Sequence, residues 1–325
     1  SLRIGASQLY LAGGATFDLR IQTQPSLYGE HVVMRILPQN TKILTIEDLG
    51  LSPMLAAEYR RLLNHPSGLV LVVGPTGSGK STTLYAGLQV LAQDASRKVI
   101  TVEDPVEYAI ENVQQTPVRP EIGFSFANAM RSFVRQDPDV ILVGEIRDQE
   151  TALEAIRASQ TGHLVLSTLH CNDTTDTVQR LVDLEMHPNS IASELLAVMS
   201  QRLARRLCEG CRRPETPDPD LMKAIFPQGV PPEARFFKGA GCARCEGHGT
   251  YGRVACLEFL KTNAVLRKTV SSRPSVEELR KVALQSGLIP MRSAALQLVY
   301  AGIISISELP LMLSWERLGP EGAGS

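Results

Sequence analysis

The chain contains Gly74-Pro75-Thr76-Gly77-Ser78-Gly79-Lys80-Ser81, a segment of the form G-x-x-x-x-G-K-[ST]. An apolar run, 69–73, comes directly before it and has the β-branched composition of a buried strand. The residues that follow it, 81–86, are typical of the start of a helix. A strand, a glycine-rich loop and a helix in this order indicate a phosphate-binding loop and therefore a nucleotide site.

Backbone chemistry explains why this loop would bind a polyphosphate. Its glycines let N–H groups turn inward, and the helix N-terminus adds about half a positive charge. We expect Lys80 to contact the β- and γ-phosphates and the Ser81 hydroxyl to bind Mg²⁺. The alternative is a glycine-rich turn that fits the pattern by accident, which the flanking strand and helix disfavour. The predicted nucleotide-binding residues are Gly74, Pro75, Thr76, Gly77, Ser78, Gly79, Lys80, Ser81 and Thr82.

Size and composition limit the class of protein. With 325 residues, 43% of them hydrophobic, the chain is long enough for two or three domains with substantial cores. No apolar run approaches the roughly 18 residues of a membrane span. The formal net charge of −1 gives no overall attraction to nucleic acid. We therefore expect a soluble globular protein without a nucleic-acid partner.

Strand and helix patterns alternate between residues 69 and 206, which predicts an α/β fold with a mostly parallel sheet. Glu103, Glu145 and His170 each follow closely on the end of an expected strand. Ligands of open α/β sheets bind at the carboxyl ends of strands, so these side chains are predicted to lie beside the phosphate loop. The expected strands are 69–73, 99–102, 140–143 and 164–168.

Glu103 and Glu145 compete for the role of general base. The strand before Glu145 ends in Gly-Glu, where many phosphate-loop proteins have an aspartate. The longer glutamate side chain could bind Mg²⁺ directly, bind it through water, or position the attacking water. His163, near the start of its strand, is expected to be a core histidine, in contrast to His170.

Four of the six cysteines form two Cys-x-x-Cys pairs separated by 30 residues, which fits a structural Zn²⁺ site. Glycines around the second pair allow the tight turns that such a site needs. Because four thiolates fill the coordination sphere, this zinc would stabilise structure and take no part in catalysis. Cys171 and Cys256 have no partner at ligand spacing and are expected to be free thiols. The predicted zinc ligands are Cys208, Cys211, Cys242 and Cys245.

The remaining segments complete the domain organisation. Residues 1–37 predict three or four short strands, in which pattern alone makes Arg20 and Arg35 exposed surface residues. Helices are expected after residue 260, with a disordered tail at 319–325. The predicted parts are the end of an N-terminal domain, a linker with a helix, a nucleotide-binding core, a zinc subdomain and a C-terminal helical subdomain. Their boundaries are 1–40, 41–66, 67–206, 207–260 and 261–325.

Together the motifs resemble those of the ATPases that power type II secretion and type IV pilus assembly, over nearly the whole chain. The tetracysteine element resembles the assembly or secretion branch of that family, since the pilus-retraction branch lacks it. The resemblance implies a RecA-like core, preceded by the remnant of a PAS-like α/β domain and followed by a zinc-binding insertion and a small helical region. The matching segments are 74–85 (Walker A), 99–108 (aspartate box), 137–148 (atypical Walker B) and 161–170 (histidine box).

The resemblance also implies roles for the N-terminal residues and for partners. Segments 18–25 and 29–35 resemble the end of the PAS-like domain, whose two arginines, here Arg20 and Arg35, contact the γ-phosphate when that domain closes over the core. It implies a cytoplasmic ring of six subunits that docks on an inner-membrane platform protein. Most of the PAS-like domain and the family's N-terminal recruitment domain have no counterpart here, so we expect the chain to be a fragment.

The leading hypothesis is a motor that uses ATP, Mg²⁺ and a structural Zn²⁺. Glu103 would activate water, Glu145 would support metal and water geometry, and His170 would sense the γ-phosphate, with Arg20 and Arg35 completing the site. Hydrolysis of ATP to ADP and phosphate would move the domains of the ring and drive secretion or pilus assembly. One alternative is a nucleotide-gated, zinc-stabilised scaffold with little hydrolysis. Another is a RecA-like nucleic-acid translocase, suggested by Arg202, Arg205, Arg206, Arg212 and Arg213.

Overall fold

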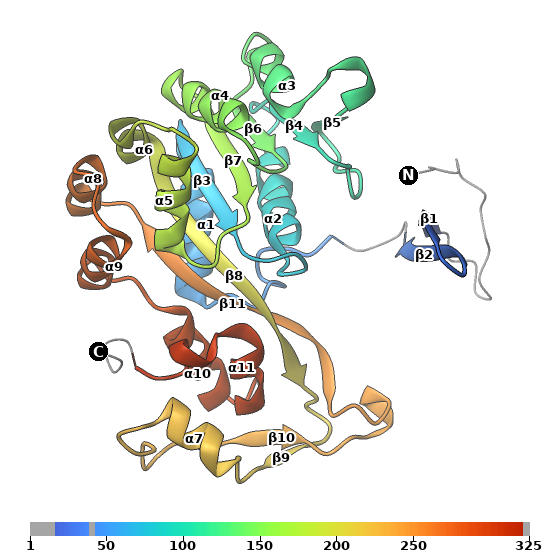
Figure 1. Cartoon of the computed structure of the whole chain (residues 1–325), viewed down its shortest axis with the longest axis vertical. Coiled ribbons are helices and arrows are strands. Elements are labelled where there is room, and N and C mark those ends of the chain that lie inside the picture. Colours follow the sequence, from blue (N-terminus) through green and yellow to red (C-terminus); the bar gives the residue numbers. More distant parts are fainter. Residues whose placement is uncertain (1–16, 39–42, 321–325) are drawn as a thin grey trace. The chain divides into compact units, whose positions relative to one another are not determined.

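The computed structural model describes residues 17–38 and 43–320, and the chain divides into two compact units, 1–43 and 44–325. The described part of the first unit is an antiparallel hairpin of β1 (Phe17–Ser26) and β2 (Gly29–Pro38) (Figure 1). Arg20 and Arg35 are paired positions of this hairpin, and Arg35 is exposed. The side chain of Arg20 lies outside the described residues. So do residues 1–16, which include part of the segment predicted to form short strands.

The second unit is built around a seven-stranded sheet of order β11-β8-β3-β7-β6-β4-β5. Neighbouring strands are parallel, except that β11 is antiparallel to β8. All four strands expected from the sequence are present, and the prediction of a mostly parallel sheet is confirmed. The strands are β3 (Gly68–Val73), β4 (Val99–Glu103), β5 (Val113–Pro117), β6 (Val140–Val143), β7 (Leu164–Leu169), β8 (Leu195–Leu207) and β11 (Thr250–Lys261).

Helices cover both faces of this sheet, because its central strands are apolar on both sides (Figure 1). Leu69, Leu71 and Val73 of β3 belong to a core shared with α3 (Phe126–Phe133), α4 (Gln149–Gln160), α5 (Thr174–Asp183), α6 (Pro188–Glu194), α8 (Ala264–Ser271) and α9 (Val276–Gln285). On the other face lie α1 (Pro53–Leu63) and α2 (Lys80–Ala92), which are joined by a hydrogen bond of 2.9 Å from the Tyr59 hydroxyl to the Thr83 carbonyl oxygen.

Local polar residues determine where several helices begin. Ser52 accepts a hydrogen bond from the Leu55 N–H at the start of α1. Asp148 caps α4, and Asp173 caps α5 by accepting from two backbone N–H groups of the first turn. Ser275 caps α9 by accepting from the Glu278 N–H. The caps at Asp148 and Asp173 fix the ends of the loops that carry Glu145 and His170.

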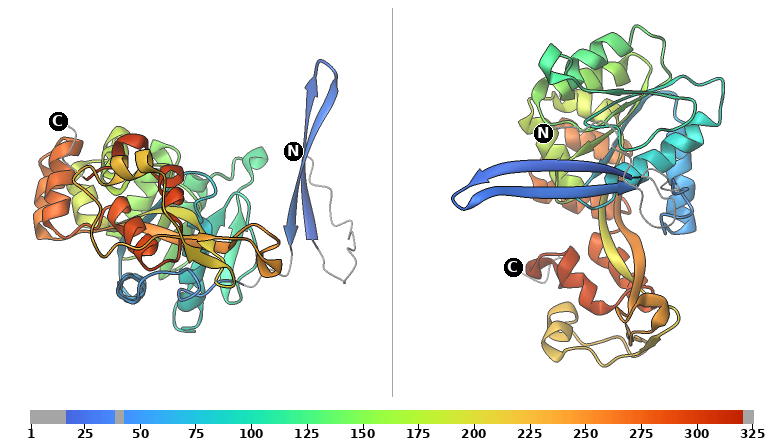
Figure 2. Two further views of the ribbon diagram at one scale, coloured as in Figure 1. Left: turned by 90° about the horizontal axis from the view of Figure 1, so that it is seen from below. Right: turned by 90° about the vertical axis from the view of Figure 1, so that its right-hand side faces the viewer.

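Strands β8 and β11 extend beyond the sheet into a C-terminal region (Figure 2). There Ala204, Val254 and Cys256 pack with α10 (Met291–Tyr300) and α11 (Leu309–Met312) in a second core. Strands β9 (Arg212–Pro214) and β10 (Phe237–Gly239) pair antiparallel, and α7 (Pro219–Ile225) lies between them in sequence. Short 3₁₀ helices are η1 (Pro120–Ile122), η2 (Ala243–Cys245), η3 (Ile306–Glu308) and η4 (Trp315–Arg317).

The finer domain boundaries remain predictions, and residues 321–325 of the tail expected to be disordered lie outside the described residues. Cys171 and Cys256 are free thiols, as expected. Across the described ranges, none of the helices combines the length and the apolar character needed to cross a membrane.

Candidate nucleotide and metal sites

The phosphate loop joins β3 to α2, as the sequence predicts. Gly77 and Gly79 have φ values of +79° and +86°, a backbone conformation that side chains with a Cβ atom rarely adopt. Lys80 Nζ donates to the carbonyl oxygens of Gly74 and Pro75, at 2.9 and 3.1 Å, so the lysine reaches from the first helical position across to the start of the loop. The loop is therefore closed on itself around its lysine.

Two features of the loop fit a bound phosphate. Among the residues that the structure describes, Ser78 Oγ is the one buried side-chain nitrogen or oxygen atom with no hydrogen-bond partner. Gly79, the residue before α2, offers no side-chain cap to the first turn, and that turn contains no acidic residue. An orphaned hydroxyl and an uncapped helix N-terminus both supply donors that an anion would accept. Ser81 and Thr82 lie in that first turn, and Ser81 is exposed.

Glu145 and His170, just beyond the carboxyl ends of β6 and β7, lie near Lys80 at the start of α2. His170 Nε2 lies 3.5 Å from Glu145 Oε2, and Arg147 donates a short hydrogen bond to the same carboxylate. Partial burial raises the pKa of Glu145, but Arg147, His170 and Lys80 outweigh it and hold that pKa below its usual range. Burial lowers the pKa of Lys80, Arg202 adds to this, and Glu145 opposes it. Glu145 is therefore an ionised carboxylate with 17% of its side chain exposed.

Glu103 lies in a different environment, although it also ends a strand. It is only 4% exposed, and its carboxylate accepts hydrogen bonds from Thr101, Tyr85 and Gln115. Burial and the neighbouring Glu103 raise the pKa of Tyr85, so the tyrosine hydroxyl remains a donor. The Tyr85 ring is packed edge-to-face on Tyr108, with centroids 4.5 Å apart. Glu103 is thus enclosed by its own side-chain donors.

Several of these neighbours were missed by the sequence reasoning. Tyr85 lies one turn beyond the phosphate loop in α2, and Gln115 lies in the edge strand β5, which was not expected. Arg147 follows Glu145 by two residues in the segment already singled out, so its charge alone could have suggested a partner. Gln201 contacts the phosphate loop from β8, and no local pattern reveals that contact. His163 Nδ1 lies 2.9 Å from the Ala158 carbonyl oxygen at the end of α4, and the ring is partly buried.

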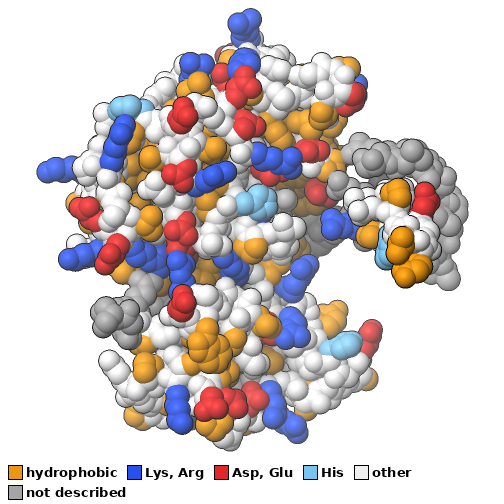
Figure 3. Space-filling model, viewed as in Figure 1, with side chains coloured by type: hydrophobic (Ala, Val, Ile, Leu, Met, Phe, Trp, Pro, Cys, Tyr) orange, Lys and Arg blue, Asp and Glu red, His pale blue; other side chains and the backbone are white. Residues whose placement is uncertain are grey.

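The basic run that suggested a nucleic-acid translocase is largely engaged within the chain. Arg205 pairs with Glu308, and Arg206 pairs with Glu209, at 2.8 and 2.9 Å. Arg202 donates to two backbone carbonyl oxygens, and Arg212 donates to one. On the face shown in Figure 3, basic and acidic side chains are interspersed and no continuous basic patch is formed. This arrangement gives the translocase alternative no support.

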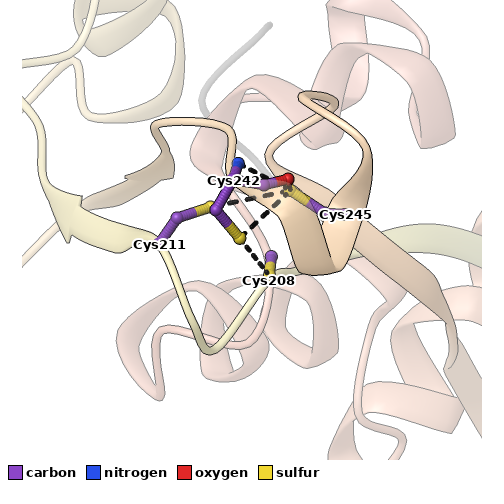
Figure 4. Close-up of side chains that lie close together, drawn as sticks. All are labelled: Cys208, Cys211, Cys242 and Cys245. Carbon is purple, nitrogen blue, oxygen red and sulfur yellow. Dashed lines mark hydrogen bonds between the residues drawn. The ribbon is translucent and has the colours of Figure 1, made fainter.

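The four predicted zinc ligands converge from two loops, with their sulfur atoms directed toward one another (Figure 4). All four Sγ atoms lie within 4.8 Å of one another. Measured separations are 3.8 Å for Cys208 to Cys242, 3.8 Å for Cys211 to Cys245 and 3.7 Å for Cys242 to Cys245. A tetrahedron with a centre-to-corner distance of about 2.3 Å, the usual Zn–S length, has edges of about 3.8 Å. The cluster therefore has the size of a Zn²⁺ site.

Backbone groups around this cluster complete its environment. Cys245 Sγ accepts from the N–H groups of Cys242 and Gly249, at 3.3 and 3.2 Å. Burial raises the pKa of Cys245, but these N–H groups, together with hydrogen bonds from the Cys242 and Cys211 thiols, outweigh it and lower that pKa to about 6, which favours the thiolate that a metal needs. A Cβ atom on Gly239 would lie 1.9 Å from the Gly249 carbonyl oxygen, so the two chain segments that frame the cysteines approach too closely for any other residue.

Comparisons with known proteins agree with this geometry. A family described as "Type II/IV secretion system protein" matches residues 5–311. The chain is 41% identical over 301 residues to the type IV pilus assembly ATPase PilB of Thermus thermophilus, covering 92% of this chain and 34% of that protein. It is 42% identical over 297 residues to the type II secretion system ATPase E of Vibrio cholerae, covering 91% and 58%. The chain thus spans between a third and three fifths of the length of these relatives.

A solved structure of the pilus retraction motor PilT with bound ADP has the same fold, with a TM-score of 0.68 and 29% sequence identity over 94% of this chain and 76% of that one. The ATPase DotB of Legionella pneumophila, at 21% identity and a TM-score of 0.66, covers 92% of this chain and 73% of its own and shares the fold. The PilT comparison confirms the predicted RecA-like core. Since the family match extends over most of its length, the chain belongs to the type II/IV secretion system protein family.

Proposed function

We propose that this chain is the ATP-hydrolysing core of a motor for type II protein secretion or type IV pilus assembly. The observation that carries the proposal is the phosphate loop with its orphaned Ser78 hydroxyl, placed beside Lys80, Glu145 and His170. The names of the related proteins, which are ATPases of these two systems, support it. The substrate is ATP, and Mg²⁺ bound with it would neutralise charge on the transferring phosphate.

The site residues suggest a division of labour. Lys80 would hold the phosphates, and Ser81 would supply a hydroxyl ligand for Mg²⁺. Of the two glutamates, Glu145 has the better claim to position the attacking water, because its carboxylate is ionised, partly exposed and next to His170. The sequence prediction that Glu103 activates water stays a prediction, and it requires that a water reach a carboxylate that already accepts from three protein side chains and is 4% exposed.

The wider assembly is also part of the proposal. It comprises a cytoplasmic ring of six subunits, contact with an inner-membrane platform protein, and closure of the N-terminal domain so that Arg20 and Arg35 reach the γ-phosphate. Structural Zn²⁺ at the four cysteines would hold the C-terminal region together. A pull-down with the full-length protein would show whether it associates with a secretion machine or a pilus machine.

Phosphate release tests the core of the proposal. The parent protein should hydrolyse ATP in a Mg²⁺-dependent reaction, and Lys80→Ala should lower turnover by about three orders of magnitude, because a cation is removed from the transferring phosphate. Lys223→Ala is the matched control, since Lys223 is an exposed lysine on α7. Near-parental turnover in Lys80→Ala, with an unchanged circular dichroism spectrum, would end the assignment. Nucleotide binding with negligible phosphate release by the full-length assembly would favour the scaffold instead.

A further inference from the structure

Gln201, in the middle of β8, makes hydrogen bonds to the phosphate loop and to the helix that follows it. It is 1% exposed, and both ends of its amide group are engaged. Its Nε2 donates to the Ser78 carbonyl oxygen at 2.8 Å, and its Oε1 accepts from Thr83 Oγ1 at 2.7 Å. A single side chain from a distant strand therefore connects the loop with the first turn of α2.

The glycines at the two ends of the loop show how closely Gln201 fits. A Cβ atom on Gly74 would lie 2.5 Å from the Gln201 backbone oxygen, and one on Gly79 would lie 2.7 Å from Gln201 Nε2. Real Cβ atoms essentially never make such contacts. The backbone of residue 201 thus leaves no room for a side chain at Gly74, and at Gly79 a side chain would displace the Gln201 amide from its hydrogen bonds.

The hydrogen bond to Ser78 controls the orientation of one peptide group. A trans peptide directs its carbonyl oxygen and the following N–H to opposite sides. Because the Ser78 oxygen is held by Gln201, the Gly79 N–H is directed away from Gln201. Backbone N–H groups of glycine-rich loops are the donors that hold phosphates. Loss of the Gln201 donor would leave this peptide free to turn.

The burial of a polar side chain at this position of β8 is also unusual. The strand begins with apolar buried residues, Leu195 to Met199, and becomes polar at Ser200 and Gln201 while it is still buried. An apolar residue at 201 would satisfy the sheet, whereas a buried amide has a desolvation cost unless its hydrogen bonds are made. Here those bonds are made to the loop and to the helix that follows it.

We propose that Gln201 is a positioning residue, which holds the Ser78–Gly79 peptide in the orientation that binds the phosphates of ATP. The inference rests on the proposed function, because it concerns the same nucleotide. Gln201 would act through the loop without contacting the substrate. The proposal predicts that replacing Gln201 changes nucleotide affinity more than it changes the stability of the fold.

The experiment measures binding of a fluorescent ADP analogue and the thermal unfolding midpoint without nucleotide. Gln201→Leu should weaken binding by about tenfold, the equivalent of one hydrogen bond. Thr177→Val is the matched control, because it removes a buried hydroxyl that donates at 2.8 Å to the Asp173 carbonyl oxygen within α5. The control should lower the midpoint to a similar extent and leave the affinity for the analogue within twofold of the parent.

Gln201→Glu supplies a readout that a purely structural role would not give. A carboxylate can accept from Thr83 but cannot donate to the Ser78 oxygen until it is protonated, and burial raises its pKa. Relative to the parent, the affinity of Gln201→Glu should therefore recover as the pH is lowered from about 8 to about 5.5. This variant also tests the proposal if Gln201→Leu does not fold.

The outcomes separate the two proposals. Two results would overturn the positioning role alone, provided that the parent binds the ADP analogue. One is unchanged affinity in Gln201→Leu, and the other is an equal loss of affinity in Gln201→Leu and Thr177→Val. A pH profile of Gln201→Glu parallel to that of the parent would also overturn it. Failure of the parent itself to bind the ADP analogue would overturn the proposed function and this inference together.

Discussion

The phosphate loop and the cysteine cluster are both connected to β8, but the chain completes them to different degrees. At the cysteines, four sulfurs lie at the separations of a filled tetrahedron, and backbone N–H groups already donate to one of them. At the phosphate loop, one buried hydroxyl has no partner and the helix N-terminus has no side-chain cap. At the cysteines the chain supplies all four ligands that a structural metal needs, whereas the phosphate loop leaves donors for a substrate.

The same difference separates the two glutamates of the nucleotide site. Glu103 resembles the cysteine cluster, because three side chains of the protein already satisfy it. Glu145 resembles the phosphate loop, because its carboxylate is partly exposed and surrounded by cations. Groups whose partners all come from the protein are expected to be structural, and groups with free donors or acceptors are expected to be reactive. Changes at Glu145 and at the loop should then affect turnover, and changes at the cysteines should affect stability.

The largest effect is expected from removal of zinc. Elemental analysis should find about one Zn²⁺ per chain, and the apparent binding energy of a structural site is on the order of 10 kcal/mol. A chelator, or Cys242→Ser, should therefore increase hydrogen exchange throughout 207–250. Strands β3 and β7 should keep their protection, since they pair within the main sheet. Cys171→Ser is the control. Metal-free protein with an unchanged exchange pattern would remove the basis for calling this site structural.

Changes at Glu145 are expected to have the next largest effect. Glu145→Gln should lower turnover by about 10²–10⁴-fold and disturb its Mg²⁺ dependence, with ATP affinity retained, because it removes the charge that orients water and metal. Glu103→Gln should lower the unfolding midpoint through its buried hydrogen bonds and change turnover less. Steady-state kinetics and thermal unfolding of both variants measure this. The opposite order, with turnover lost in Glu103→Gln at an unchanged midpoint, would restore Glu103 as the general base.

Sequence reasoning reached the fold and most of the site for identifiable reasons. The phosphate loop, the strand ends and the cysteine pairs are local patterns, and parallel strands bring their carboxyl ends to one edge whatever lies between them. In the sheet, Glu145 and His170 lie at this edge near Lys80 of the loop, and their roles stay predictions. Spacing also placed the four cysteines, because two Cys-x-x-Cys turns need only one close approach between them.

What the sequence could not show depends on contacts between distant segments. Gln201 is an ordinary polar residue in a strand until its amide is seen under the phosphate loop. The enclosure of Glu103 depends on Gln115 in a short edge strand whose polar residues do not read as a strand. For Arg20 and Arg35, the pattern favoured exposed surface positions and the family resemblance favoured the γ-phosphate.

The smallest effect is expected from replacing Arg20 or Arg35. These variants test whether the hairpin contributes to the nucleotide site. Arg20 and Arg35 are paired positions of β1 and β2, and like charges at paired positions destabilise an antiparallel ladder by a few tenths to about 1 kcal/mol. Replacing either one should therefore leave the hairpin at least as stable as before. If the pair contacts the γ-phosphate, Arg35→Ala or Arg20→Ala in the full-length protein should lower turnover by about tenfold and leave ADP affinity unchanged, because ADP lacks the group they contact. Gln24→Ala, an exposed change in the same hairpin, should alter neither quantity. Equal turnover in all three variants and the parent would return both arginines to the surface role that the strand pattern alone assigns them.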